Sequence, residues 1–176
     1  MNFLEKIKIE KFTSHDKKEV KELIENIYSK TYFDKTTVLD YYRLLDCVFI
    51  NGTNTFEEYS IKIIYRKKII GIMLLSEYQL YLILEMYNDE KTIKNIIEYK
   101  DKEVLMSRFT GVHIKYQNKG LYSTMIEYVQ KNYKKFDYLC GIQNKHKGLS
   151  NMDFFLKRRK VVAEIENSVY TVQDLK

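Results

Sequence analysis

One stretch, residues 104–129, most constrains what this chain can fold into. It begins with an apolar, β-prone run that ends near Ile114. A short polar loop with a single glycine, Gly120, follows, and then Met125, Ile126 and Val129 recur at helical spacing. The pattern predicts a strand, a loop and a helix. Such a loop directs consecutive backbone N–H groups and the positive end of a helix toward one point, which suits a phosphate or pyrophosphate.

Strand and helix patterns continue on both sides of this stretch. Alternating apolar residues predict strands, apolar residues three and four apart predict helices, and Asn or Gly clusters predict turns. Residues 78–87 are apolar and fit either an extended strand or an insertion. The predicted order is strand 4–12, helix 13–28, helix 36–45, a hairpin of strands 59–65 and 69–76, helix 89–97, the central strand, loop and helix, strand 136–142, helix 149–156, and strands 161–165 and 169–172.

Length and composition restrict the classes of protein that fit. A chain of 176 residues is long enough for one domain with a real core and too short for two ordinary ones. The net charge of +6 favours acidic ligands, but it is spread along the chain and does not by itself indicate nucleic-acid binding. The two cysteines, Cys47 and Cys140, form no Cys/His cluster, so we expect no metal site. We also expect no membrane span and a cytoplasmic location.

The loop resembles the acyl-CoA signature of the GNAT superfamily of N-acyltransferases, V-x-x-x-x-[Q/R]-x-x-G-x-[G/A]. This chain supplies Val112, Gln117 and Gly120, and it departs from the pattern at Tyr122, where the family usually has a small residue. The resemblance implies one domain over residues 1–176 with an α/β (α+β) fold. It implies a mixed, mostly antiparallel central sheet flanked by helices, with a split between the two middle strands for acyl-CoA.

The resemblance also implies the residues that bind acetyl-CoA or coenzyme A. Backbone groups of Thr110 and Val112 would pair with the pantetheine. Lys115 and Lys119 either add charge to the site or are ordinary surface lysines. Asn144 and Asn151 occupy positions where the family often places an asparagine near the pantetheine. The pyrophosphate would be held by backbone N–H groups of Gln117, Asn118, Lys119, Gly120, Leu121, Tyr122 and Ser123.

The residues that transfer protons are less evident. Family members often use a Tyr on the last helix as the general acid, and here Phe154 and Phe155 fill that region. The candidate catalytic residues are therefore Asn144, Ser150 and His146, with Cys140 as another donor. His146 is also readable as a solvated surface histidine. Possible bases are a water molecule, Glu77 or Glu85. Arg108 either binds an acidic acceptor or pairs with a carboxylate at the sheet surface.

These observations leave two function hypotheses open. The first is an acetyl-CoA-dependent N-acetyltransferase that acts on a primary amine of a small molecule, a peptide or an RNA-linked acceptor, as a monomer or homodimer. The second is a catalytically weak or inactive CoA-binding module of the same fold, with nucleic acid as a further contact. The basic run 157–160 motivates the nucleic-acid contact, although it also fits a solvated helix end.

Overall fold

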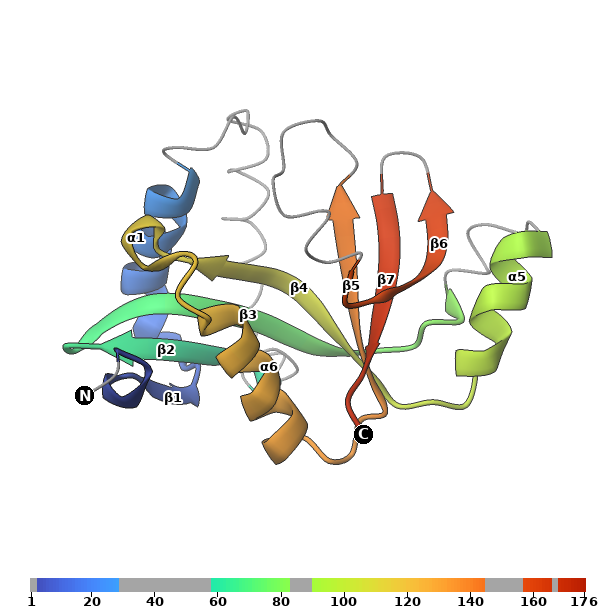
Figure 1. Cartoon of the computed structure of the whole chain (residues 1–176), viewed down its shortest axis with the longest axis horizontal. Coiled ribbons are helices and arrows are strands. Elements are labelled where there is room, and N and C mark those ends of the chain that lie inside the picture. Colours follow the sequence, from blue (N-terminus) through green and yellow to red (C-terminus); the bar gives the residue numbers. More distant parts are fainter. Residues whose placement is uncertain (1–2, 29–57, 83–89, 145–156, 166–167) are drawn as a thin grey trace. The chain divides into compact units, whose positions relative to one another are not determined.

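The computed structural model describes residues 3–28, 58–82, 90–144, 157–165 and 168–176 (Figure 1). These residues form two compact units. The first unit takes Met1–Ser76 and Phe109–Lys131, and the second takes Glu77–Arg108 and Asn132–Lys176. The expectation that residues 1–176 form a single domain stays a prediction. The predicted helix 36–45, helix 149–156 and Cys47 lie outside the described residues, and so does the second half of segment 78–87.

Within the described residues, seven strands join in the order β1-β2-β3-β4-β5-β7-β6. The strands are β1 (Lys8–Lys11), β2 (Ile61–Tyr65), β3 (Lys68–Tyr78), β4 (Val104–Val112), β5 (Tyr138–Asn144), β6 (Lys160–Ile165) and β7 (Ser168–Asp174). The α-helices are α1 (Lys17–Tyr28), α5 (Glu90–Ile96) and α6 (Leu121–Asn132). Short 3-10 helices are η1 (Phe3–Lys6), η2 (Ser14–Asp16), η3 (Ile97–Tyr99) and η4 (Ile114–Tyr116).

The sheet is mixed, as the sequence predicts. The β1–β2, β2–β3, β5–β7 and β6–β7 pairs are antiparallel, and the β4–β5 pair is parallel. The β4–β5 pairing begins at Val104 and Tyr138 and ends at Ser107 and Gly141. Both strands continue past that point. The ladder between the two middle strands is therefore shorter than the strands themselves, and the split for acyl-CoA stays a prediction.

Two predicted strand ends need correction. The first strand spans only Lys8–Lys11, because Phe3–Lys6 forms a 3-10 helix. The ring of Phe3 lies 5.2 Å from that of Tyr65, and ring packing of this kind competes with extended pairing. The central strand ends at Val112, and Ile114 belongs to η4.

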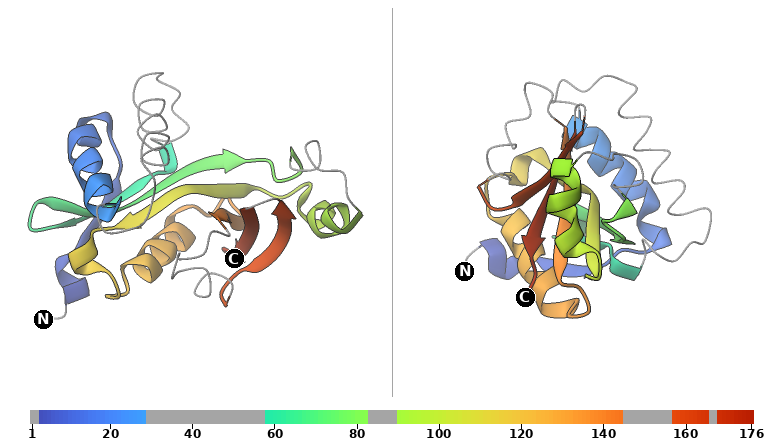
Figure 2. Two further views of the ribbon diagram at one scale, coloured as in Figure 1. Left: turned by 90° about the horizontal axis from the view of Figure 1, so that it is seen from above. Right: turned by 90° about the vertical axis from the view of Figure 1, so that its right-hand side faces the viewer.

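In the first unit, α1 and α6 lie on opposite faces of the strands (Figure 2). The apolar stripe of α1 consists of Val20, Leu23 and Ile24, three and four residues apart. This stripe forms one buried cluster with Ile72 and Leu74 of β3. The buried stripe of α6 consists of Leu121, Met125, Ile126 and Val129. The sequence predicts Met125, Ile126 and Val129 of this stripe, and the structure adds Leu121.

A buried ion pair ties the start of the first helix to the sheet. Lys62 of β2 is only 8% exposed, and its Nζ donates to both carboxylate oxygens of Asp16 at 2.7 Å. The backbone N–H and the hydroxyl of Thr13 donate to the same carboxylate, at 2.8 and 2.9 Å. Burial favours the neutral form of Asp16, but these hydrogen bonds outweigh it and lower its pKa.

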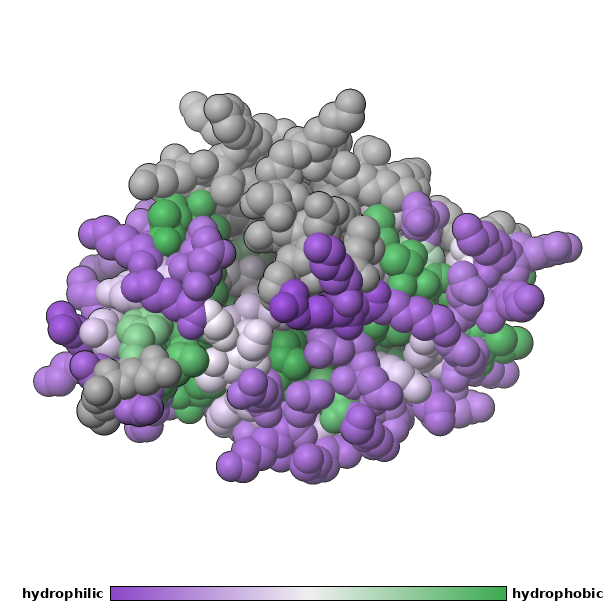
Figure 3. Space-filling view, viewed as in Figure 1, coloured by the Kyte–Doolittle hydropathy of each residue, from purple (hydrophilic) through white to green (hydrophobic). Residues whose placement is uncertain are grey.

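In the second unit, α5 packs against β6, and β7 lies between β5 and β6 (Figure 1). The core contains Leu80, Ile96, Met106 and Cys140, all at most 1% exposed. A Cβ at Gly141 would lie 2.2 Å from a guanidinium nitrogen of Arg159, so glycine leaves room for this buried side chain. On the face shown in Figure 3, hydrophilic residues cover most of the described surface.

Candidate functional site

The loop between β4 and α6 lies wholly within the first unit. After β4 ends at Val112, η4 makes one turn, and the backbone then takes the left-handed conformation at Asn118 (φ 59°) and at Gly120 (φ 80°). Helix α6 begins at the next residue, Leu121. Left-handed backbone is unstrained for glycine and tolerated by asparagine. The two residues that bend this loop are therefore of the types that the bend favours.

Hydrogen bonds hold the start of the loop in place. The His113 N–H donates to the carbonyl of Ile70 on β3 at 2.8 Å, and the Ile114 N–H donates to Asn26 Oδ1 on α1 at 3.3 Å. The Gln117 side chain donates through Nε2 to the carbonyl of Val112 at 3.2 Å. The motif glutamine thus ties the loop to the end of β4, which is a positioning role.

The first turn of α6 directs backbone donors out of the helix end. The Thr124 N–H donates to the Gly120 carbonyl at 3.0 Å, and this is the first hydrogen bond of the helix. The N–H groups of residues 121–123 therefore have no carbonyl within the helix to bond to. The Gln117 N–H, by contrast, donates to the Ile114 carbonyl at 3.3 Å. The donors best placed for an anion are thus those after Gln117.

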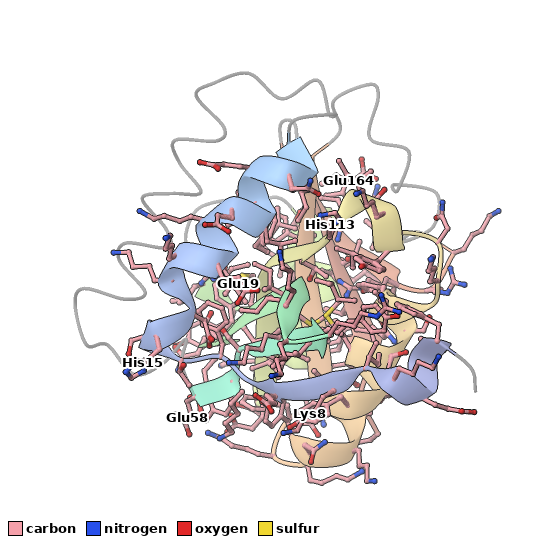
Figure 4. The ribbon with its side chains drawn as sticks, turned by 90° about the vertical axis from the view of Figure 1, so that its left-hand side faces the viewer. Lys8, His15, Glu19, Glu58, His113 and Glu164 are labelled. Carbon is pink, nitrogen blue, oxygen red and sulfur yellow. The ribbon has the colours of Figure 1, made fainter. Side chains whose placement is uncertain are left out.

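His113 sits at the hinge between β4 and the loop (Figure 4). Its Nδ1 accepts the Lys115 N–H at 3.2 Å and so caps η4. Burial lowers the pKa of His113, and the charges of Lys115 and Lys68 lower it further. Lys115 and Lys68 thus place two positive charges near this ring, at the entrance to the loop.

The predicted cofactor residues that the structure describes follow one another along β4 and the loop. Thr110 and Val112 are half-buried near the end of β4, and Tyr122 is half-buried in the first turn of α6. Leu121 is 2% exposed, so only its backbone can face a ligand. The remaining residues of this set are exposed, namely Gln117, Asn118, Lys119, Gly120 and Ser123.

Most of the predicted catalytic residues lie outside the part of the chain that the structure describes. His146, Ser150 and Asn151 lie outside the described residues. Asn144 is the last residue of β5, opposite Ser168 of β7. Cys140 is fully buried, and burial raises the pKa of its thiol to about 12, so it is a core residue that holds its proton tightly. Its assignment as a proton donor has no support in its surroundings.

Charged candidates in the second unit have partners of their own. The guanidinium of Arg108 lies 5.1 Å from the ring centroid of Tyr78 in a cation–π contact, and its pairing with a carboxylate or an acidic acceptor stays a prediction. Glu77 accepts a hydrogen bond from Lys135, which engages one of the possible bases. In the basic run 157–160, Arg159 is buried and Lys160 pairs with Glu98. The run is therefore not a uniform basic surface.

Sequence reasoning missed the residues that shape this end of the sheet. Asn26 and His113 position the loop, and Tyr116 packs against Phe3. A histidine directly after the motif valine was a usable signal, because a side chain there must lie at the loop entrance. No comparable signal marks Asn26, which is 88 residues away from its partner Ile114.

No protein-family model and no curated protein matches this sequence. Solved structures match nearly all of it. PH1933 from Pyrococcus horikoshii OT3 is 16% identical, with a TM-score of 0.66 over 96% of this chain and 98% of that chain. The PaiA N-acetyltransferase from Thermoplasma acidophilum, solved in complex with coenzyme A, is 14% identical, with a TM-score of 0.66 over 96% of this chain and 98% of that chain.

An acetyltransferase of the GNAT family from Listeria monocytogenes 4b F2365 is 7% identical, with a TM-score of 0.63 over 96% of this chain and 94% of that chain. The chain therefore has the GNAT fold, which confirms the expectation drawn from the loop motif. Among the helices of the described residues, none is long and apolar enough to cross a membrane.

Proposed function

We propose that this protein transfers an acetyl group from acetyl-CoA to a primary amine. The observation that carries the proposal is the backbone after Gln117. Left-handed Asn118 and Gly120 turn the chain into the start of α6, where successive N–H groups precede the first helical hydrogen bond. A pyrophosphate fits this donor set, because its oxygens accept hydrogen bonds and its charge is favoured at the helix N-terminus.

We propose a role for each part of this loop and of the strand before it. The N–H groups of residues 118–123 hold the pyrophosphate, and Lys119 adds positive charge. Backbone groups of Thr110 and Val112 at the end of β4 pair with the pantetheine, while Gln117 and His113 keep the loop in shape. Binding at several points along one strand holds the thioester in line for attack, which can supply much of the rate acceleration.

The reaction itself is a single acyl transfer. The amine nitrogen forms a bond to the thioester carbonyl carbon, and the carbon–sulfur bond breaks. The sulfur keeps the bonding electron pair and takes up a proton, while the nitrogen loses one. Residues 144–151 contain the candidates for this proton transfer, Asn144, His146 and Ser150. The acceptor is a small-molecule amine, a peptide or an RNA-linked amine.

A second candidate function is a CoA-binding module without turnover. It is favoured by the states of two described proton-transfer candidates, since Cys140 is buried with a raised pKa and Glu77 is engaged by Lys135. Release of free thiol from acetyl-CoA separates the two functions. The panel of acceptors comprises amino acids, polyamines, peptides and aminoacyl-tRNA, with a reaction lacking amine as the control. Thiol release above that control with one acceptor supports the transferase. Binding of acetyl-CoA without such release across the panel supports the module.

A further inference from the structure

The first unit contains a second feature, a pocket on the β2–β3 side of the loop. Its volume is about 350 Å³, at the small end of the range for ligand sites. The side chains that line it come from the hairpin and from the start of the loop. The polar and aromatic members are Tyr65, Arg66, Lys68, His113, Lys115 and Tyr116. The lining includes no residue from 117–123, although Lys119 Nζ lies 5.6 Å from the ring centroid of Tyr116.

The cations Arg66, Lys68 and Lys115 line this pocket, and the guanidinium of Arg66 lies over the ring of Tyr65, 5.2 Å from its centroid. Within the described part of the chain, no carboxylate forms an ion pair with Arg66, Lys68 or Lys115. Elsewhere in the chain, several lysines do have carboxylate partners, as Lys62 has in Asp16.

Aromatic rings supply the rest of the lining, and they hold one another in place. The ring centroids of Tyr65 and Tyr116 are 5.7 Å apart with an edge-to-face geometry. Phe3 lies outside the lining and stacks on Tyr116 at 5.8 Å with an interplanar angle of 6°. His113 lies 5.5 Å from Tyr116. Rings fixed in this way lose little freedom when a ligand binds, so the pocket is preorganised for a flat ring.

The hairpin carries backbone strain at the same place. The two central turn residues, Arg66 and Lys67, have φ values of 50° and 64°. A two-residue hairpin turn with both φ values positive favours Asn-Gly. A side chain with a Cβ atom is strained in the left-handed conformation, so both residues store strain. Strained backbone of this kind clusters at ligand-binding and active sites, where a side chain is kept for its function although it does not suit the backbone conformation.

We propose that this pocket binds one nucleotide unit, with its phosphate on the cations and its base against the tyrosine rings. Cations that neutralise phosphate, combined with aromatic faces that stack on bases, form the usual recognition chemistry for single nucleotides and single strands. The volume admits one ring with its phosphate. The unit could be a free mononucleotide or the 5′ end of an RNA strand, and both present the same chemistry to the pocket.

Binding of two probes to the full chain tests the proposal. The probes are AMP and a 5′-phosphorylated oligoadenylate, titrated at physiological salt with saturating coenzyme A present so that AMP does not occupy the loop. Lys68→Gln should weaken binding about tenfold, because it removes a charge-assisted hydrogen bond. The matched control is Lys67→Gln, which removes the same charge from the same turn but lies outside the pocket lining. It should change the affinity less than twofold.

A ring variant and inorganic phosphate complete the experiment. Tyr116→Leu should weaken both probes several-fold, since base stacking is lost while an apolar contact to Phe3 remains. The tighter probe identifies the source of the nucleotide. The proposal is overturned if neither probe binds the wild type, or if both lysine variants have the same effect. Inorganic phosphate that competes as well as AMP would also overturn it, because the rings would then contribute nothing.

Discussion

At the scale of single residues, the protonation state of His113 decides whether it can cap η4 at the start of the loop. Its pKa is lowered first by burial and then by two nearby lysines, so the neutral ring dominates at pH 7. The neutral ring accepts the Lys115 N–H at Nδ1, and a proton on that nitrogen would remove this cap. The histidine thus links pH to the order of the loop.

The folded protein should therefore lose stability when His113 is forced to take up a proton. The unfolded chain titrates this histidine near pH 6.5, and the folded chain does so at lower pH. The unfolded state binds more protons in that window, so the free energy of unfolding should fall as the pH drops from about 6.5 through the folded-state pKa. His113→Asn, whose amide oxygen can keep the cap without titrating, should show a smaller fall. Urea unfolding at several pH values checks this, and equal falls would contradict it.

Asp16 and Lys62 form an ion pair that stabilises the fold, since each charge is costly to bury without the other. Asp16→Asn should lower the free energy of unfolding by about 2 kcal/mol, because it removes the short charged hydrogen bonds of the Lys62 ammonium and leaves it with Glu10 at 3.9 Å. Adding Lys62→Met to that variant should restore most of the loss. A double variant as unstable as Asp16→Asn in urea unfolding would show that the pair itself is not the cause.

At the scale of elements, the turn of the β2–β3 hairpin holds Arg66 and Lys67 at positive φ, a conformation that favours glycine or asparagine. Lys67→Gly should raise the free energy of unfolding by about 0.5–1 kcal/mol, because glycine adopts a positive φ without strain. Lys68→Gly is the control, since Lys68 begins strand β3 and glycine weakens strands. Thermal unfolding of both variants checks the sign. A destabilised Lys67→Gly variant would show that the turn is not strained.

Most helices and strands could be predicted, because the spacing of apolar residues that indicates them lies within a short stretch of sequence. The stripes of α1 and α6 and the alternation of β2 and β3 belong to this class, and so does the glycine that opens α6. Contacts between distant segments were not predictable. Nothing near Lys62 indicates Asp16, and nothing near Gly141 indicates that Arg159 lies over it. The strand end at Val112 was missed because Ile114 is apolar although it lies in a 3-10 turn.

At the scale of the whole molecule, the proposed cofactor loop and the proton-transfer candidates belong to different units. The loop lies within Phe109–Lys131 of the first unit, whereas Asn144 and the residues after it belong to the second. The loop could be assigned from sequence because backbone groups and one glycine define it. The proton donor could not, because a side chain defines it and no motif in the sequence marks that side chain. The central claim is therefore that the loop after β4 binds acetyl-CoA.

The shift in melting temperature with saturating acetyl-CoA, compared between the wild type and Gly120→Val, tests that claim most directly. A ligand at a hundred times its Kd adds about 2.7 kcal/mol, which predicts a rise of about 5 °C or more for the wild type. Valine should remove most of the rise, because it cannot adopt a φ of 80° without strain, although the space around Gly120 is open. Asn118→Gly keeps the left-handed bend and should preserve the rise. No rise in the wild type, or an equal rise in Gly120→Val, would contradict the assignment of this loop.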